Sequence, residues 1–422
     1  IKKRVQVFFK YKYLLEKHMK ELAQLGTEEN GKTVEESIAE LEKCIELTEF
    51  ATSLPQVATG EVMEVSNGID CRTQVVPLGV VASIVPFNFP TMVPNWTLPN
   101  AIALGNCMIM KPSEKVPLSI CKLAELLKEA GLPDGVFNIV HGDSEIVEAI
   151  CDHPGIEAVS FVGSTKVAKI VYKRATGNYK RCLAMGGAKN HLVVLPDAKQ
   201  DLTAQNIIAS MSGCAGQRCM AAGAMIGVGN VDSIIEKVCN EARKMIPGAN
   251  LGAVINKQAK ERIEAYITEA EKNGAKVLVD GRNTVVKGKE KGTYVGPTVI
   301  DYVTPDMSVA KEEIFGPVIS ILRTKTIDEA IKIENASPYG NAASVFTENG
   351  SIASYVIDNA SAGMIGVNVG VPVPREPFSF GGWNESKFGV GDITGKSSIP
   401  FWTKLKKSTT KWHAEQKIDW MS

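Results

Sequence analysis

The first element of the chain is predicted to be an amphipathic helix, because apolar residues recur at spacings of three and four. These residues are Phe8, Tyr11, Leu15, Met19 and Leu22. A second helix is predicted after Thr33 and Glu36, which have the spacing of a capping box. Its apolar positions are Ile38, Leu41 and Ile45.

Residues 58–78 alternate between apolar and polar positions around the turn pair Asn67-Gly68. A period of two together with an Asn-Gly pair predicts a β-hairpin. Two interpretations of this hairpin stay open: a plain surface arm, or an arm that pairs with another subunit.

From Gly79 onward, short apolar runs alternate with helical patterns. A helix begins at Pro117 and ends at Gly131, with proline at its start and glycine past its end. The first series of predicted strands comprises residues 80–85, 107–110, 137–140 and 158–162. The second series comprises strands 191–195, 276–279 and 319–322 and helices 231–246 and 257–273. This alternation predicts an α/β fold with doubly wound parallel sheets, divided near residue 188.

Two later segments are predicted from their composition. Residues 280–293 are rich in Gly, Lys and polar residues, which is typical of an exposed loop. The segment from Lys396 alternates in Thr403-Lys404-Leu405-Lys406 and predicts an edge strand.

The balanced charge of the chain narrows the classes of partner. Its 422 residues contain 47 Lys and Arg against 47 Asp and Glu, so no basic face for nucleic acid or an anionic membrane is indicated. The nine cysteines form no CxxC pair and no Cys/His zinc spacing, which is typical of a reducing compartment without structural zinc. The longest apolar runs are too short to span a bilayer. The sequence begins at Ile1 rather than Met, which leaves room for a preceding targeting segment.

The stretch CAGQRCM, residues 214–220, carries the candidate nucleophile Cys219. A free thiol has a pKa of about 8.5 and reacts as the thiolate. Arg218 places a positive charge next to Cys219, and Gly216 lets the backbone approach a ligand. The alternative is that Cys219 is a small buried apolar residue, as most free cysteines are.

Two polar motifs follow predicted strands, where α/β sheets bind ligands. PFNFP (86–90) places Asn88 where its amide can donate to a developing oxyanion, or simply satisfy its own turn. MKPSE (110–114) places Lys111 and Glu114 where they can bind ribose hydroxyls, or form a solvated loop.

Two further motifs have a similar ambiguity. FVGST (161–165) ends a strand and begins a helix, so that Ser164 marks either a phosphate site or an ordinary N-cap. No GxGxxG fingerprint is present. KEEIFGP (311–317) contains a carboxylate pair, Glu312-Glu313, which without a ligand is typical of a surface.

Taken in order, these motifs resemble those of the aldehyde dehydrogenase superfamily over essentially the whole chain. The motifs are PFNFP, MKPSE, FVGST, GQRC, EEIFGP, SPYG (337–340) and FSFGG (378–382). The resemblance implies an α/β fold with a doubly wound cofactor domain, a catalytic domain, and a β-hairpin oligomerisation arm that completes a neighbouring subunit's sheet. It places the NAD-binding domain at 1–57 and 79–187, the catalytic domain at 188–395, and the arm with the C-terminal segment at 58–78 and 396–422.

The resemblance also implies roles for the candidate residues. Cys219 attacks the aldehyde to form a thiohemiacetal, and hydride transfer to the nicotinamide leaves a thioacyl enzyme. Asn88 and the backbone N–H of Cys219 form the oxyanion hole. The implied cofactor-binding residues are Phe87, Lys111, Glu114, Ser164, Glu313 and Phe315. Because Glu114 would repel a 2′-phosphate, NAD is expected rather than NADP.

One departure from the superfamily pattern concerns release of the acyl group. Most members have Glu-Leu-Gly-Gly-Lys where this chain has MGGAK (185–189), so Met185 replaces the glutamate that activates water. A methionine is not a base, so a better nucleophile such as the thiol of coenzyme A is expected. GAKNH, GQRCM and PREPF (374–378) resemble the CoA-acylating methylmalonate-semialdehyde dehydrogenase branch. The implied reaction converts malonate or methylmalonate semialdehyde, with NAD and CoA, to acetyl-CoA or propionyl-CoA with loss of the substrate carboxylate.

Such a substrate requires a cationic clamp. Arg218 can hold a carboxylate through two hydrogen bonds. The branch usually offers a second arginine where this chain has Lys43, which keeps the charge but loses the planar fork. By the same resemblance, the opening strands of the cofactor domain are expected to be missing from the given sequence, and the segment 247–251 is expected to be shorter than in most members.

Two other functions remain as alternatives. One is a hydrolytic NAD(P)-dependent aldehyde dehydrogenase with another base, and the other is a structural protein on the same scaffold. No metal, nucleic acid or membrane partner is expected. A homodimer or homotetramer is expected, in the cytoplasm or, in a eukaryote, in the mitochondrial matrix.

Overall fold

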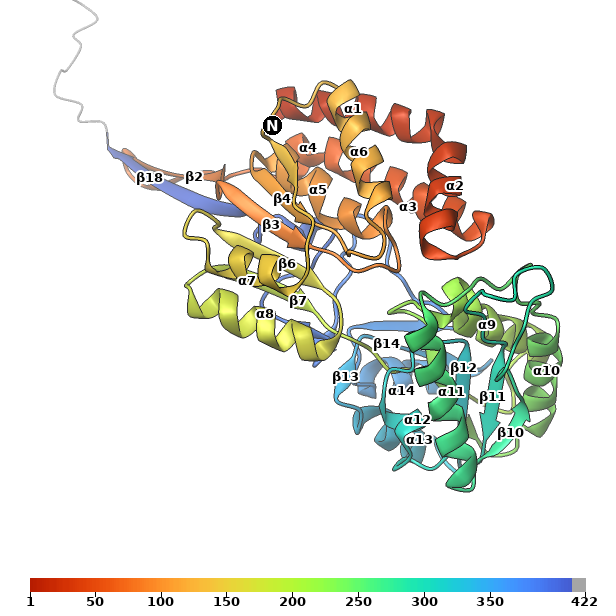
Figure 1. The fold of residues 1–422 in the computed structure, drawn as a ribbon. Helices are drawn as coiled ribbons and strands as arrows, with labels where there is room; N and C mark the ends of the chain where they lie inside the picture. Colours follow the sequence, from red (N-terminus) through yellow and green to blue (C-terminus); the bar gives the residue numbers. More distant parts are fainter. Residues whose placement is uncertain (412–422) are drawn as a thin grey trace, which may run out of the picture.

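Two β-sheets with helices on both faces form the body of the protein (Figure 1). The computed structural model describes residues 1–411. The first sheet has the strand order β17-β7-β6-β3-β4-β5, in which only β17 is antiparallel to its neighbour. Its strands are β3 (Val80–Ile84), β4 (Cys107–Lys111), β5 (Phe137–Ile139), β6 (Ala158–Val162), β7 (Arg181–Met185) and β17 (Lys387–Phe388).

The second sheet has the order β10-β11-β12-β9-β8-β14-β15, in which only β10 is antiparallel to its neighbour. Its strands are β8 (Asn190–Val194), β9 (Ala222–Val228), β10 (Lys276–Val279), β11 (Thr298–Asp301), β12 (Val318–Thr324), β14 (Ala342–Phe346) and β15 (Met364–Val367). The predicted α/β class with parallel sheets is therefore confirmed.

Helices cover both faces of the first sheet because its strands are apolar on both sides. In β3, Val81 packs into one core cluster with the N-terminal helices. The next residue, Ala82, packs into another cluster with the helices of residues 144–152 and 165–177. The helices of this half are α1 (Lys2–Lys17), α2 (Met19–Asn30), α3 (Val34–Thr52), α4 (Leu54–Val57), α5 (Met92–Leu104), α6 (Leu118–Glu129), α7 (Ser144–Asp152) and α8 (Thr165–Gly177).

The second sheet is covered in the same way. Met225 of β9 packs with the helices on one face, and its neighbour Ala224 packs with those on the other. The helices are α9 (Gln200–Ser212), η1 (Gly213–Gly216), α10 (Asp232–Arg243), α11 (Lys257–Lys272), α12 (Ser308–Lys311), α13 (Ile327–Asn335) and α14 (Gly350–Asn359). A further short helix, η2 (Lys396–Ser398), precedes the last strand.

The predicted N-terminal helices are present with one difference. The apolar stripe continues through residues 8–22, but the helix divides at His18, so that α1 ends at Lys17 and α2 begins at Met19. The capping box before α3 is confirmed, because the Thr33 hydroxyl accepts from Glu36 N–H and Glu36 accepts from Thr33 N–H.

The predicted hairpin is confirmed as β1 (Val62–Ser66) and β2 (Ile69–Pro77), which pair in antiparallel register. The last strand, β18 (Thr403–Lys411), pairs with β2 along its whole length, so the arm has the order β1-β2-β18 and projects from the body (Figure 1). Residues 412–422 of the predicted C-terminal segment lie outside the described residues.

The chain returns to the first sheet near its end. A two-stranded ladder joins β13 (Tyr339–Gly340) to β16 (Trp383–Asn384), and β17 then pairs with β7. Residues 383–388, inside the range predicted for the catalytic domain, thus tie the two halves together. Within residues 1–411, no helix is long and apolar enough to cross a membrane.

Candidate active site

The loop that carries Cys219 is shaped by an uncommon backbone turn. Cys214, Ala215 and Gly216 all have positive φ, at 51°, 53° and 73°. A side chain at Gly216 would clash with the backbone of Gly316. The strained turn is held from outside, because Cys214 N–H donates to Glu36 of α3 at 2.6 Å. The turn directs the chain from α9 back toward β9, with Cys219 between them.

Cys219 lies where two cavities meet. One is a cavity of about 250 Å³, called here the helix-side cavity, and the other, of about 240 Å³, is called the strand-side cavity. The helix-side cavity is lined by residues of α3, such as Lys43, and by residues of the segment 371–376, such as Glu376. Trp96 and Arg218 also line it. Cys219 is half-buried and lines both cavities.

The electrostatic surroundings of Cys219 differ from the expectation. Burial raises the pKa of its thiol to about 12, the charge of Glu313 adds to the rise, and Arg218 opposes it. Arg218 lowers the thiol pKa less than burial and Glu313 raise it. Its guanidinium donates to the carbonyls of Ala209 and Ser210, at 2.7 and 3.0 Å. In the free protein Cys219 is therefore a thiol at neutral pH.

Asn88 lines the strand-side cavity together with Cys219. Its Nδ2 donates to the carbonyl of Gln217 at 2.8 Å, which fixes the amide against the nucleophile loop. The amide nitrogen carries two hydrogens, and within residues 1–411 the Gln217 carbonyl is the one acceptor that they have. The second hydrogen is left for a ligand.

The strand-side cavity brings together four more of the predicted residues, which are Phe87, Ser164, Glu313 and Phe315. The rings of Phe87 and Phe315 meet edge to face, with centroids 5.9 Å apart. Ser164 is at the start of α8, but its hydroxyl makes no capping hydrogen bond. The first-turn N–H groups of α8 are thus available to an anion.

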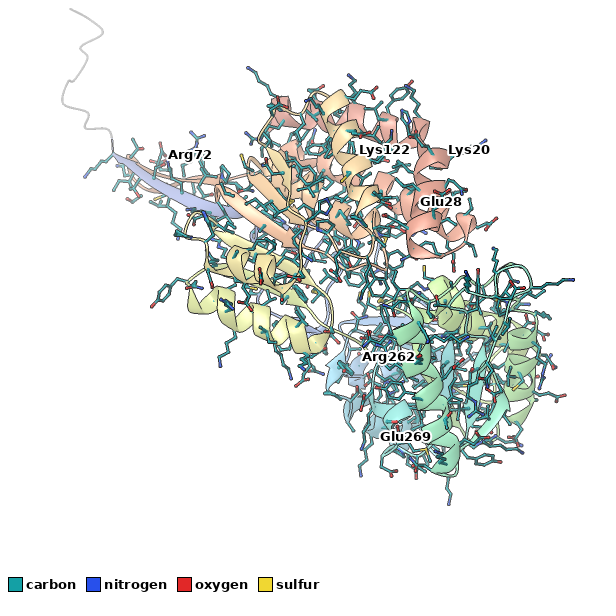
Figure 2. All side chains as sticks on the ribbon, in the orientation of Figure 1. Lys20, Glu28, Arg72, Lys122, Arg262 and Glu269 are labelled. Carbon is teal, nitrogen blue, oxygen red and sulfur yellow. The ribbon has the colours of Figure 1, made fainter. Side chains whose placement is uncertain are left out.

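Arg262 also lines this cavity and was not predicted. It lies on the half of α11 that faces the first sheet, whereas Glu269 lies further along the same helix (Figure 2). Its guanidinium donates to the carbonyl of Ile314 at 3.1 Å and so holds the segment that carries Glu313 and Phe315.

Lys111 and Glu114 lie apart from this cavity. They are found at the end of β4, where Lys111 Nζ is 3.5 Å from Glu114 Oε2. Lys111 is buried, whereas the Glu114 side chain is exposed. Their place at the carboxyl edge of the sheet, one strand beyond β3, is consistent with binding to the far end of a long cofactor.

Two ionisable groups, the half-buried Glu313 and the buried Lys189, line a pocket together with Cys219. Burial raises the pKa of the Glu313 carboxyl to about 7, against the opposing effect of a hydrogen bond from Ala188 N–H. Burial also lowers the pKa of the Lys189 ammonium to about 7, and its Nζ has no hydrogen-bond partner within residues 1–411. The sequence analysis included Lys189 in MGGAK but gave it no role; a lysine two residues before the predicted strand 191–195 was the available signal.

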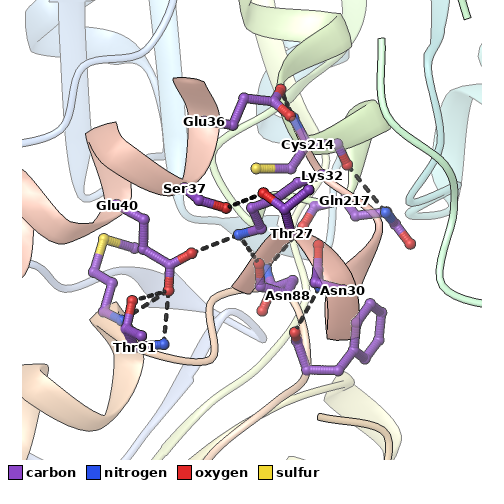
Figure 3. A network of polar contacts seen from close by, with 12 residues as sticks. Thr27, Asn30, Lys32, Glu36, Ser37, Glu40, Asn88, Thr91, Cys214 and Gln217 are labelled. Atoms are coloured by element: carbon purple, nitrogen blue, oxygen red, sulfur yellow. Dashed lines mark hydrogen bonds and ion pairs between the residues drawn. The ribbon is translucent and has the colours of Figure 1, made fainter. Parts of the chain in front are cut away.

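A buried network holds the backbone of Asn88 (Figure 3). Lys32 Nζ donates to the backbone carbonyl of Asn88 at 2.7 Å and to Glu40 Oε2 at 2.6 Å. Glu40 Oε1 in turn accepts from the backbone and hydroxyl of Thr91, both at 2.7 Å. Glu36 connects the same helix, α3, to Cys214. One helix therefore positions both loops of the candidate site.

Lys43, the second predicted clamp residue, is already paired. Its Nζ donates to Glu376 Oε2 at 2.6 Å and to Glu46 Oε2 at 3.1 Å. The predicted clamp cations do line one cavity with Cys219, but each has protein partners in this structure.

Met185 ends β7, where it is buried between β6 and β17. The next two residues, Gly186 and Gly187, line the strand-side cavity. A side chain at Gly187 would contact the Glu313 carboxylate, so glycine there keeps the cavity open.

A sequence profile described as the aldehyde dehydrogenase family matches residues 1–408. The chain belongs to the aldehyde dehydrogenase family. It is 43% identical to malonate-semialdehyde dehydrogenase 2 of Geobacillus kaustophilus over 98% of this chain and 87% of that protein. It is 44% identical to the rat mitochondrial methylmalonate-semialdehyde/malonate-semialdehyde dehydrogenase [acylating], over 98% of this chain and 78% of the relative.

Solved structures of the aldehyde dehydrogenase family have the same fold. A Sinorhizobium meliloti protein crystallised as a complex with NAD superimposes with a TM-score of 0.96. It is 41% identical, over 98% of this chain and 86% of that chain. The predicted family and fold are thus confirmed.

Proposed function

We propose that this aldehyde dehydrogenase is a CoA-acylating enzyme that oxidises malonate or methylmalonate semialdehyde with NAD. The observation that carries the proposal is the thioether of Met185 at the end of β7. By the resemblance of MGGAK to the family's Glu-Leu-Gly-Gly-Lys, Met185 stands in place of the water-activating glutamate. Without that base, the thioacyl enzyme persists until a thiol nucleophile arrives. The similarity to the rat enzyme named as acylating supports the same conclusion.

In the proposed reaction the aldehyde enters the helix-side cavity and Cys219 Sγ forms a bond to the carbonyl carbon. The free N–H of Asn88 and the backbone N–H of Cys219 stabilise the developing oxyanion. Because burial keeps Cys219 protonated in the free protein, its proton must leave on attack. Glu313, with a pKa of about 7, is the nearby group suited to take that proton at neutral pH.

The strand-side cavity fits the nicotinamide end of a dinucleotide. Phe87 and Phe315 offer flat apolar surface, and the start of α8 at Ser164 offers N–H groups to a pyrophosphate. Lys111 and Glu114 lie where they can bind the adenosine ribose, and the Glu114 carboxylate disfavours a 2′-phosphate. NAD, when bound, supplies the hydride acceptor.

Release of the acyl group follows from the same residues. The thiol of CoA attacks the thioacyl carbonyl, the bond to Cys219 Sγ breaks, and a new thioester forms on CoA. The proton of the CoA thiol returns to Cys219. Loss of the substrate carboxylate as CO₂, with a proton from solvent added to the carbon that carried it, gives acetyl-CoA or propionyl-CoA.

Mass spectrometry of the products tests this proposal. With malonate semialdehyde, NAD and CoA, acetyl-CoA is expected in equal amount to NADH. Malonate in place of acetyl-CoA would contradict the proposal.

Hydrolysis is the second candidate function, because Glu313 is a carboxylate beside Cys219 whose pKa lies near 7. Such a group can activate water as well as accept the thiol proton. If CoA-independent turnover is observed and is lost in Glu313→Gln, the hydrolytic function replaces the acylating one.

A further inference from the structure

The wall between two cavities holds a compact cluster of charges. Lys43, Glu46, Arg375 and Glu376, called here the rim cluster, are joined by three ion pairs of 2.6, 3.1 and 3.0 Å. Lys43 and Glu376 line the helix-side cavity, whereas Glu46, Arg375 and Glu376 line an outer cavity of about 570 Å³. Glu376 thus lies on both sides of the wall.

Of the three carboxylates around the helix-side cavity, only Glu376 is bound to a candidate clamp cation. Glu40 is paired with Lys32 and also accepts from Thr91. Glu36 accepts from the backbone N–H groups of Thr33 and Cys214.

Lys43 and Arg218 both line this cavity, and Lys43 is the one that the rim cluster holds. Arg218 uses Nη2 for two backbone carbonyls, while its Nε has no hydrogen-bond partner within residues 1–411. An ammonium has three donors, and two of those on Lys43 are used by Glu376 and Glu46. A ligand carboxylate that binds Lys43 must take the third donor beside the Glu376 carboxylate, or replace that carboxylate.

We propose that Glu376 is a specificity-determining residue whose carboxylate holds Lys43 and competes with the carboxylate of the substrate. This inference rests on the proposed function, since it requires an anionic semialdehyde in the helix-side cavity. The Glu376 side chain is only 8% exposed, so water screens its charge poorly. Glu46 is 41% exposed, so its charge affects an incoming anion less.

Competition of this kind has a defined consequence for substrate choice. It weakens binding of every carboxylate-bearing aldehyde and leaves an uncharged aldehyde unaffected. Removal of the Glu376 charge, with its shape retained, should therefore lower KM for malonate semialdehyde about tenfold and leave KM for propanal unchanged, as repulsion between close charges at a partly buried site predicts.

The test compares Glu376→Gln, the matched variant Glu46→Gln, and Lys43→Met. The first readout is KM for malonate semialdehyde and for propanal. The second is protection of Cys219 against iodoacetamide by malonate, a carboxylate probe that needs neither NAD nor CoA. E376Q is expected to strengthen malonate protection about tenfold, E46Q less than about threefold, and K43M to weaken it.

Unchanged or weaker protection in E376Q, together with weakened protection in K43M, overturns the role of Glu376 but keeps Lys43 as the anion site. Equal strengthening in E46Q and E376Q also overturns it, because the effect is then one of overall charge. Absence of malonate protection in all proteins, including the wild type, overturns both the inference and the anionic substrate.

Discussion

The protonation state of Cys219 is the residue-scale feature with the most direct chemical consequence. Because burial raises its pKa to about 12, the reactive thiolate fraction in the free protein should rise about tenfold with each pH unit. We expect the alkylation rate of Cys219 by iodoacetamide to increase without a plateau from about pH 7 to about pH 10. The rate is followed by mass spectrometry of the peptide that contains Cys219, with Cys219→Ser as the control.

A plateau in that profile below about pH 9 would show that Arg218 outweighs burial. The comparison matters because residue pattern alone favoured a lowered pKa, from the charge next to the thiol. The position of that charge could not be read from the sequence: the guanidinium donates to the carbonyls of Ala209 and Ser210 at the end of α9.

Glu313 gives a second residue-scale prediction, on stability. Its folded-state pKa of about 7 lies above the usual value of about 4.3. Its contribution to stability is therefore full below about pH 4 and is lost as the pH rises through about 7. Glu313→Gln removes this loss, so the melting temperature of the variant relative to the wild type should increase from about pH 5 to about pH 8.

The exposed Glu269 of α11 provides the matched control for this measurement (Figure 2). Glu269→Gln should keep a constant difference from the wild type over the same range. If the melting temperature of Glu313→Gln falls relative to the wild type as the pH rises, the carboxylate is stabilised in its charged form and the account of Glu313 is wrong.

Motif order predicted a large part of the candidate site at this scale. Asn88, Ser164 and Glu313 meet Cys219 around one cavity. Asn88 and Ser164 follow neighbouring parallel strands, whose carboxyl ends lie at one edge of the first sheet, whereas Cys219 and Glu313 precede β9 and β12 of the second sheet. The pairing of Lys43 with Glu376 could not be predicted, since the two residues are 333 positions apart in sequence. Such a pair depends on how the two halves pack, which residue spacing does not encode.

At the scale of elements, α3 is the helix to test, because it positions both site loops. Lys32 and Glu40 form a buried ion pair with side chains 0% and 2% exposed. Lys32→Met leaves the Glu40 carboxylate buried without a counter-ion, which should destabilise the protein by about 3–5 kcal/mol. The variant is measured by urea denaturation.

The double variant Lys32→Met/Glu40→Gln should regain most of this stability. The amide that replaces the Glu40 carboxylate has no charge, yet its oxygen can still accept from Thr91. If the double variant is as unstable as Lys32→Met, the loss comes from the packing of Lys32 on Phe89, whose ring centroid lies 4.3 Å from its Nζ, and not from an unpaired charge.

Local signals predicted the hairpin and the capping box, because both depend on residues a few positions apart. They did not predict α5, which contains Pro99 and is buried along almost its whole length. Proline argues against a helix interior, and a helix that is apolar on all sides has no period to detect. Tertiary burial decides the structure of that segment.

At the scale of the whole molecule, the arm presents apolar residues to solvent. Met63 and Val65 of β1 are 64% and 53% exposed, and β1 is an edge strand. Exposed apolar edges are typical of protein interfaces, so we expect the arm to join subunits. Met63→Lys/Val65→Lys should reduce the molecular mass in solution, as measured by light scattering.

An unchanged mass in that double variant would leave the arm as a plain surface feature, the alternative that the alternating sequence pattern left open. The existence of two α/β halves could be predicted from the alternation of strands and helices. Their connection through β16 and β17 could not, because two-residue strands carry no pattern of their own.

The central claim is that the thioacyl enzyme waits for CoA, and pre-steady-state formation of NADH tests it most directly. Wild-type protein is mixed with NAD and malonate semialdehyde, with and without CoA. The account predicts a burst close to one NADH per Cys219 without CoA, followed by steady turnover only when CoA is added. Fast steady turnover without CoA would contradict it and would identify an enzyme that activates water without a glutamate at position 185.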